Sequence, residues 1–382
     1  MAAVGGTKTH LNEIFAQAVD RSIREHGEVG LHVAIYRDGE LVVDAWGGVA
    51  DPLTGRKVEA HTLFPVFSVT KAVTATALHI QAERGLVEYD KPIAHYWPEF
   101  AAEGKDRTTV RDALSHRTGI PQMPEGVTPD QMADYEWMVD QLARMKPWFE
   151  PGTTNAYHCY SFGWIVAEIV RRTDPKRRPF GAFVQEEICA PLRIQDLYIG
   201  IPDEAEPRVA RLIDPPDMQM PADAPFLKCI PPQVGCLQEV FGRPTVRRGC
   251  IPGAGGIMNA RGAARLFAML ANQGELDGVR LLSAQRVRSF SNPRPDTDEQ
   301  PDAILGFPVR VGTAGYWLGG PSAPTVVGSN PRTLHHPGAG GSIGWANTET
   351  RTAGAICHNR MFNGPDDPFA PIAQAVHRCF GS

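Results

Sequence analysis

The sequence predicts an α/β fold of the α+β type, in which one antiparallel sheet is built from both ends of the chain and flanked by helices. Two pairs of strand-like segments support this, LHVAIYRDGELVVDAWGG near the start and SIGWANTETRTAGAICHN near the end. Between them no strand–helix–strand alternation indicates a parallel sheet, and helical patterns dominate. We therefore expect a mostly helical domain inserted between the two halves of the sheet.

The terminal elements follow in order. Apolar residues recur at helical spacing from about residue 8 to 26, which predicts a first helix. The next two strands flank Asp38-Gly39, a dipeptide typical of tight hairpins. The last hairpin is followed by a helix expected from about Pro368 to Phe380.

The middle of the chain contains several helical patterns. AVTATALHIQAERG predicts a helix that ends at Gly85, and Asp90 with Pro92 has the character of a helix start. VRDALSHRTG contains Asp112 and Arg117, which we expect to be structural, as a cap or an ion pair. Further helices are expected in QMADYEWMVDQLARM and SFGWIVAEIVRRT.

These elements predict two domains. Residues 1–75 and 255–382 form a discontinuous α/β domain, and residues 76–254 form a helical insertion. The insertion ends in a Pro-rich, aperiodic region at about 201–254, too long for a simple connector and typical of segments that border a site. Phe226 and Phe241 in this region are expected to shape a substrate pocket.

Composition excludes several classes of function. The 382 residues carry a formal net charge of −5, which argues against nucleic acid or an anionic membrane as a partner. The segment MAAVGGTKTH lacks the basic and apolar pattern typical of a signal peptide, and no apolar run reaches membrane-spanning length, so we expect neither a signal peptide nor a membrane span. The seven cysteines are scattered and form no CxxC pair, which favours reduced thiols and a cytoplasmic location. Cys229 and Cys236 lie close in sequence, but no second pair completes a zinc site.

Two segments carry residues suited to nucleophilic catalysis. In FPVFSVTKAV, Ser68 and Lys71 are three residues apart, a spacing that places both side chains on one helix face. A lysine there can hydrogen-bond the serine hydroxyl, or as a cation favour its alkoxide form. Tyr157 follows a Pro-Gly turn at a helix entrance and could act as a general base if a nearby ammonium stabilised its phenolate.

A third segment, HHPGAGGSIGW, offers a competing nucleophile. Its Gly340-x-Ser342-x-Gly344 string is the signature of a nucleophile elbow, which requires a strand, a turn and then a helix. A strand and a polar turn follow Ser342 instead, so we do not expect it to be the nucleophile. Exposed amides in such a glycine-rich turn can hold a developing oxyanion.

Together, and in this order along the chain, these motifs resemble the serine β-lactamase and penicillin-binding-protein superfamily. The resemblance rests on Ser68-Val69-Thr70-Lys71, on Pro151-Gly152-Thr153 with Tyr157, and on His336-Pro337-Gly338. Supporting strings are SHRTGIP at 115–121, GAGGIMNARGAARLFAML at 253–270 and NRM at 359–361. The pattern is most similar to class C β-lactamases and family VIII carboxylesterases, and it covers nearly the whole chain.

The resemblance implies a role for each matching residue. Ser68 is the nucleophile that forms an acyl-enzyme, and Lys71 and Tyr157 share the proton transfers, with Tyr157 preferred as the base. The backbone amides of Ser68 and Ala339 form the oxyanion hole. No cofactor and no metal are expected, since His335, His336 and His158 have no convincing ligand spacing.

Two motifs depart from the class C pattern. Class C enzymes have Tyr-x-Asn, whereas here Tyr157 is followed by His158 and Cys159, and a thiol cannot replace an amide. Their Lys-Thr-Gly motif is His336-Pro337-Gly338 here, so a permanent cation suited to a substrate carboxylate becomes an imidazole. Both changes favour neutral esters over β-lactams.

The predicted function is therefore a carboxylesterase that hydrolyses small or medium acyl esters. His336, Gly338 and His158 are expected to contact the small-molecule ester, and a histidine base is the competing mechanism. Alternatives are an acyltransferase similar to the lovastatin type, an amide or β-lactam hydrolase, and a non-catalytic penicillin-recognising binding protein. Intact Ser68, Lys71 and Tyr157 argue against the last of these.

Overall fold

The computed structural model describes residues 2–5, 10–215, 221, 223–362 and 367–381. Its main sheet is antiparallel, with the strand order β1-β3-β2-β13-β12-β11-β10, and β4 pairs with β3 beside it. The strands of this sheet are β1 (Ala3–Val4), β2 (Gly30–Arg37), β3 (Glu40–Asp51), β4 (Arg56–Lys57), β10 (Trp317–Leu318), β11 (Thr333–Pro337), β12 (Ile343–Asn347) and β13 (Thr352–His358).

The sheet joins the two ends of the chain, as the sequence predicted. β2 and β3 form a hairpin in which Asp38 and Gly39 both adopt positive φ angles, of 51° and 88°. Such a turn matches the right-handed twist of the strands, and glycine enters it without steric cost. β2 then pairs with β13, with Val33 opposite Ile356, so the N-terminal and C-terminal hairpins share one ladder. The predicted fold class is confirmed.

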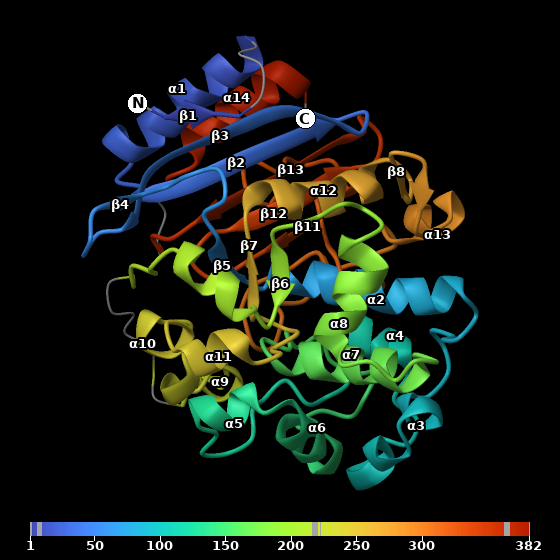
Figure 1. The fold of residues 1–382 in the computed structure, drawn as a ribbon. Helices are drawn as coiled ribbons and strands as arrows, with labels where there is room; N and C mark the ends of the chain where they lie inside the picture. Colours follow the sequence, from blue (N-terminus) through green and yellow to red (C-terminus); the bar gives the residue numbers. More distant parts are fainter. Residues whose placement is uncertain (1, 6–9, 216–220, 222, 363–366, 382) are drawn as a thin grey trace.

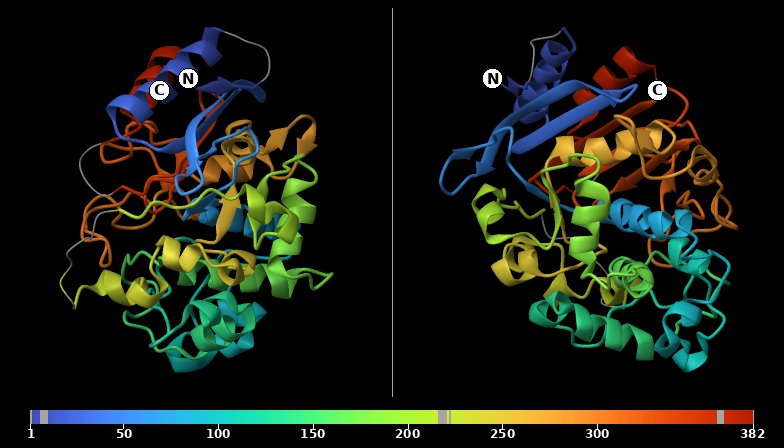
Figure 2. Two further views of the ribbon diagram at one scale, coloured as in Figure 1. Left: turned by 60° about the vertical axis from the view of Figure 1, so that its left-hand side comes forward. Right: turned by 45° about the vertical axis from the view of Figure 1, so that its right-hand side comes forward.

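Helices cover both faces of this sheet (Figures 1 and 2). Helices α1 (His10–Glu25) and α14 (Ala370–Phe380) pack on one face and α12 (Ala260–Ala271) on the other. Alternate residues of β2 face opposite ways: Val33 and Ile35 join the core under α1 and α14, whereas Ala34 joins the core that contains α12. Both terminal helices were predicted, but α14 begins two residues later than expected, and residues 8 and 9 of the first predicted helix lie outside the described residues.

The region between the sheet halves is largely helical. QMADYEWMVDQLARM forms two helices, because the Asp134 side chain caps the second by accepting the Trp137 N–H. Asp90 does not start a helix: it pairs with Arg111, and the helix begins after Pro92. Outside the Pro-rich region, the described helices between the two halves of the sheet, besides α12, are α2 (Thr70–Glu83), α3 (Ile93–Tyr96), η1 (Pro98–Gly104), α4 (Val110–Leu114), α5 (Pro129–Ala133), α6 (Tyr135–Arg144), α7 (Ser161–Thr173), α8 (Phe180–Val184), η2 (Gln185–Cys189) and α13 (Ala284–Ser289).

A second, three-stranded sheet with the order β5-β7-β6 lies between the main sheet and the helices (Figure 1). It consists of β5 (Phe64–Phe67), β6 (Leu197–Ile199) and β7 (Gly256–Met258). β6 is a strand inside the segment expected to be helical, too short for a period-2 pattern to reveal. The predicted boundary at residues 75 and 255 stays a prediction, and this sheet contains strands from both sides of it.

The Pro-rich region forms a series of short helices rather than an extended loop. They are η3 (Asp203–Arg208), α9 (Pro225–Cys229), η4 (Pro232–Val234), α10 (Gln238–Phe241) and α11 (Pro244–Arg248). Residues 216–220 and 222 of this region lie outside the described residues. A further two-stranded ribbon comprises β8 (Glu275–Leu276) and β9 (Val279–Arg280). Among the described residues, no helix combines the length and apolar character needed to cross a membrane.

Candidate active site

Ser68 lies in the tight turn between strand β5 and helix α2. The residue before it, Phe67, has a left-handed φ of 47°, a strained conformation for a bulky side chain. Thr70 holds this turn, because its hydroxyl donates to the Phe67 carbonyl and accepts the Gly256 N–H at 2.8 Å. Helix α2 begins at Thr70, so Ser68 precedes the helix instead of lying on it. The Lys71 N–H donates to the Ser68 carbonyl at 3.0 Å and so joins the turn to the first residues of the helix.

Lys71 is completely buried beneath the serine. Its Nζ lies 2.9 Å from Ser68 Oγ, 2.6 Å from the Cys159 carbonyl oxygen and 2.8 Å from the Gly253 carbonyl oxygen. Burial lowers the pKa of this amine to about 7. The two carbonyls can only accept hydrogen bonds, so a neutral amine donates both of its protons to them. Its lone pair is then left for the Ser68 hydroxyl.

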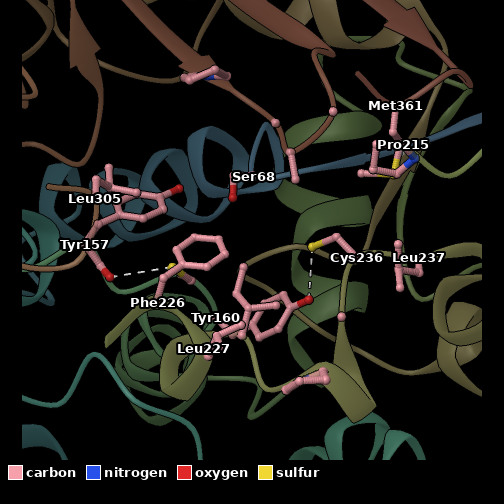
Figure 3. Close-up of a pocket in the computed structure, with 18 of the residues that line it drawn as sticks. Ser68, Tyr157, Tyr160, Pro215, Phe226, Leu227, Cys236, Leu237, Leu305 and Met361 are labelled. Carbon is pink, nitrogen blue, oxygen red and sulfur yellow. Dashed lines mark hydrogen bonds between the residues drawn. The ribbon is translucent and has the colours of Figure 1, made fainter. Parts of the chain in front are cut away.

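Tyr157 completes a cluster of three around the serine. Its hydroxyl points toward Ser68 (Figure 3), and the serine side chain has a lowering effect on the pKa of Tyr157 that burial outweighs. The Lys71 Nζ lies 5.1 Å from the centroid of its ring. Burial, with a smaller contribution from Cys159, raises the pKa of Tyr157 well above its usual value. The phenol is therefore protonated at neutral pH. These pKa directions favour Lys71 over Tyr157 as the first proton acceptor.

The end of β11 forms the opposite wall. A Cβ on Gly338 would lie 2.2 Å from the Val66 carbonyl oxygen, so only glycine lets this segment approach β5 so closely. Ser68 and Ala339 consequently line the same cavity. Within the described residues, neither the Ser68 nor the Ala339 backbone N–H donates to a protein acceptor. This arrangement is suited to the predicted oxyanion hole.

Ser342 has a structural position. Its side chain is buried, its Oγ accepts the His358 N–H at 3.3 Å, and its carbonyl accepts the Gly338 N–H at 2.6 Å. Strand β12 begins at the next residue, where an elbow requires a helix. Ser342 thus holds the turn that carries Gly338 and Ala339, and it does not line the cavity.

The cavity above Ser68 has a volume of about 620 Å³. In Figure 3, Tyr157 lies on one side of Ser68 and Met361 and Leu237 on the other, and most of the side chains drawn are apolar. Among the described lining residues, Glu239 is the only one with a charged side chain. The main apolar lining side chains are Phe226, Leu227, Ile230, Leu305, Trp317 and Met361.

The predictions that Phe241 shapes the pocket and that His158 contacts the substrate need correction. Phe226 lines the cavity as expected, but Phe241 lies behind the wall, with its ring 4.9 Å from that of Phe67. His158 is buried behind the lining, where its Nε2 contacts Thr118 Oγ1 at 2.7 Å and its Nδ1 contacts the Ala156 carbonyl at 2.5 Å. Both ring nitrogens are therefore engaged with the protein, and His158 is not placed to contact a substrate.

His336 also differs from expectation. It is fully buried on β11, with its ring 6.4 Å from that of Tyr157, and it does not line the cavity. Burial, together with the nearby Lys71, lowers the pKa of His336 well below its usual value, so the imidazole is neutral. Gly338 lines the cavity, but the two histidines predicted as substrate contacts support it from behind. Neither is placed as the base for Ser68.

The sequence did not reveal some lining residues. Leu305 and Trp317 come from a loop and a short strand with no motif and no clear periodicity, and Met361 ends the NRM string, for which no role in the pocket was expected. As for metals, no cluster of three or more histidine, cysteine or acidic side chains suited to a metal ion occurs in the described part of the chain. All seven cysteines are free thiols.

A serine in a strained turn, held against a buried lysine and facing a tyrosine in an apolar cavity, defines a serine hydrolase. The chain belongs to the β-lactamase family, whose pattern it matches over residues 12–378. It is 34% identical over 346 residues to the esterase/β-lactamase LipL of Mycobacterium tuberculosis, which covers 87% of this chain and 77% of the relative.

Solved structures agree with this assignment. A family VIII carboxylesterase is 31% identical to this chain and superimposes with a TM-score of 0.88, covering 99% of this chain and all of the other. A penicillin-binding-protein homologue from Caulobacter crescentus is also 31% identical, with a TM-score of 0.86 and coverage of 98% of each chain. The predicted superfamily is confirmed.

Proposed function

We propose that this protein is a carboxylesterase that hydrolyses small or medium uncharged acyl esters through an acyl-Ser68 intermediate. The observation that carries the proposal is the Lys71 amine, buried against Ser68 beside a cavity whose described lining residues include no cation. The esterase names of the relatives support the same chemistry. Free thiols throughout the described chain are consistent with a cytoplasmic location, which we also propose.

In the acylation step, neutral Lys71 accepts the Ser68 proton while Oγ attacks the ester carbonyl. The new C–O bond places negative charge on the former carbonyl oxygen, which the Ser68 and Ala339 amides stabilise. When the intermediate collapses, the bond to the alcohol breaks. The alcohol leaves with a proton from the Tyr157 hydroxyl, and Tyr157 is reprotonated from the Lys71 ammonium.

In the deacylation step, a water molecule takes the position of the departed alcohol. Tyr157 accepts a proton from the water while it passes its own proton to the neutral Lys71 amine, the hydroxide adds to the acyl carbonyl, and the bond to Ser68 Oγ breaks. The proton returns to Oγ, and the carboxylic acid leaves. The same residues therefore act in reverse order in the two halves of the reaction. An alcohol bound in place of water would give acyl transfer.

The charge of the cavity selects among substrates. A β-lactam carries a carboxylate that needs a cationic partner, and Glu239 at the exposed side of the cavity would repel it. An uncharged ester meets no such penalty and buries its acyl chain against apolar side chains. We therefore expect ester turnover to exceed β-lactam turnover.

The test uses p-nitrophenyl esters from acetate to decanoate, with nitrocefin as the β-lactam probe. The wild type should hydrolyse the short and medium esters, and Ser68→Ala should abolish hydrolysis. Nitrocefin turnover equal to ester turnover would reassign the protein as a β-lactamase. Product formation that requires an added alcohol would reassign it as an acyltransferase.

A further inference from the structure

A buried carboxylate lies directly behind the Tyr157 backbone. Asp302 belongs to the long connection between α13 and β10, and its side chain is 1% exposed. Its Oδ1 accepts three backbone N–H groups, from Tyr157 at 2.8 Å, Ile304 at 3.0 Å and Leu305 at 3.3 Å. One carboxylate oxygen thus binds two segments that lie about 145 residues apart in the chain.

Arg294 is the counter-ion of this carboxylate and is equally buried. Its Nη2 donates to Asp302 Oδ2 at 3.0 Å, and its Nη1 donates to the Ser115 carbonyl at 3.0 Å. The residue after Ser115, His116, places its ring 4.7 Å from that of Tyr157. The ion pair therefore also fixes the aromatic neighbour against which the Tyr157 ring packs.

The two segments that Asp302 joins both reach the substrate cavity. Tyr157 and Leu305 line it and lie next to each other on one side of Ser68 (Figure 3). We propose that Asp302 is a positioning residue that sets the Tyr157 hydroxyl and the Leu305 side chain relative to Ser68, with Arg294 as its counter-ion. This role rests on the proposed esterase function, in which Tyr157 is the proton donor and Leu305 is part of the acyl pocket. Asp302 would hold both of them in place.

The negative charge of Asp302 matters as well as its shape. An ionised carboxylate has enough lone pairs to accept three N–H groups and the guanidinium at once. In Asp302→Asn the amide oxygen can still accept some of the backbone N–H groups, but the amide nitrogen then faces Arg294, donor against donor. Arg294 is left buried without its charge partner, so the Tyr157 and Leu305 segments are expected to shift apart.

The experiment compares Asp302→Asn with a matched control, Asp174→Asn. Asp174 is also 1% exposed and pairs with Arg178 at 2.8 Å, but it does not line the cavity. Rates are normalised to the active sites titrated with a fluorophosphonate. We expect Asp302→Asn to lower kcat for p-nitrophenyl acetate at least tenfold and to change the butyrate-to-acetate ratio of kcat/KM at least threefold. The control should change both within twofold.

A milder variant, Arg294→Lys, keeps the positive charge and should move both quantities in the same direction by a smaller amount. It decides the question if Asp302→Asn does not fold. Equal kinetics of the Asp302 variant and its control, or wild-type kinetics of Arg294→Lys when Asp302→Asn does not fold, would overturn the positioning role. If the wild type hydrolyses no ester, the proposed function fails first, and the two failures are thereby distinguished.

Discussion

The protonation state of Lys71 is expected to control both the activity and the stability of this enzyme. Burial lowers the pKa of the amine from 10.5 to about 7 in the folded protein. At about 1.4 kcal/mol for each unit of pKa, the difference corresponds to about 5 kcal/mol. Between pH 7 and 10.5 the unfolded chain binds this proton and the folded protein does not. The contribution of Lys71 to the free energy of unfolding therefore rises with pH across that window. The same contribution is lost again as the pH falls toward 7.

The informative substitution is Lys71→Met, which removes the titrating group and keeps most of the side-chain volume. It leaves the carbonyls of Cys159 and Gly253 without their donor, at a cost of about 1–3 kcal/mol each that does not depend on pH. Between pH 7.5 and 9.5, the free energy of unfolding of the wild type should gain about 3 kcal/mol relative to the variant. Urea unfolding at the two pH values measures this change.

The activity of the same pair of proteins gives the second measurement. If Lys71 accepts the Ser68 proton as a free amine, kcat/KM of the wild type should rise with pH to a plateau, with an apparent pKa of about 7. Lys71→Met should lower kcat by about 100- to 10,000-fold. A stability difference that is the same at both pH values would refute the reasoning. So would wild-type activity that falls as the pH rises through 7, because the cation would then be the active form.

Two further predictions concern the proton donor and the oxyanion wall. Tyr157→Phe removes the hydroxyl that faces Ser68 and should lower kcat by about 100-fold or more in ester hydrolysis; an unchanged kcat would exclude Tyr157 from the proton transfers. Gly338→Ala places a methyl group 2.2 Å from the Val66 carbonyl, which must push Ala339 away from Ser68. We expect kcat to fall by about 100-fold with an unchanged circular-dichroism spectrum. Full activity of this variant would contradict a role for the position of Ala339 in catalysis.

The fold could be predicted from the sequence where local signals were strong. The Asp38-Gly39 turn and the alternating strands on either side of it specify a hairpin without help from the rest of the chain. Helical patterns likewise located α1, α7 and α14, with the ends of α1 and α14 placed to within about two residues. Strand β6 escaped detection because three residues carry no measurable period. The break between α5 and α6 depends on one capping carboxylate, Asp134.

The candidate site was predictable only in part, for a related reason. Ser68, Lys71 and Tyr157 belong to motifs with a chemical logic, and the structure brings the three together. His158 and His336 lie in the same motifs, but their burial behind the cavity wall depends on tertiary packing that spacing does not encode. Asp302 lies in a loop rich in acidic residues, so nothing local distinguishes it from its exposed neighbours.

The measurement that tests the central claim most directly is covalent labelling of the nucleophile. The intact protein is treated with a fluorophosphonate, digested, and the modified peptide is sequenced by mass spectrometry. We predict one adduct, on Ser68, with hydrolysis lost in proportion to labelling and with Ser342→Ala labelled like the wild type. An adduct on Ser342, or full labelling of Ser68→Ala, would contradict the account.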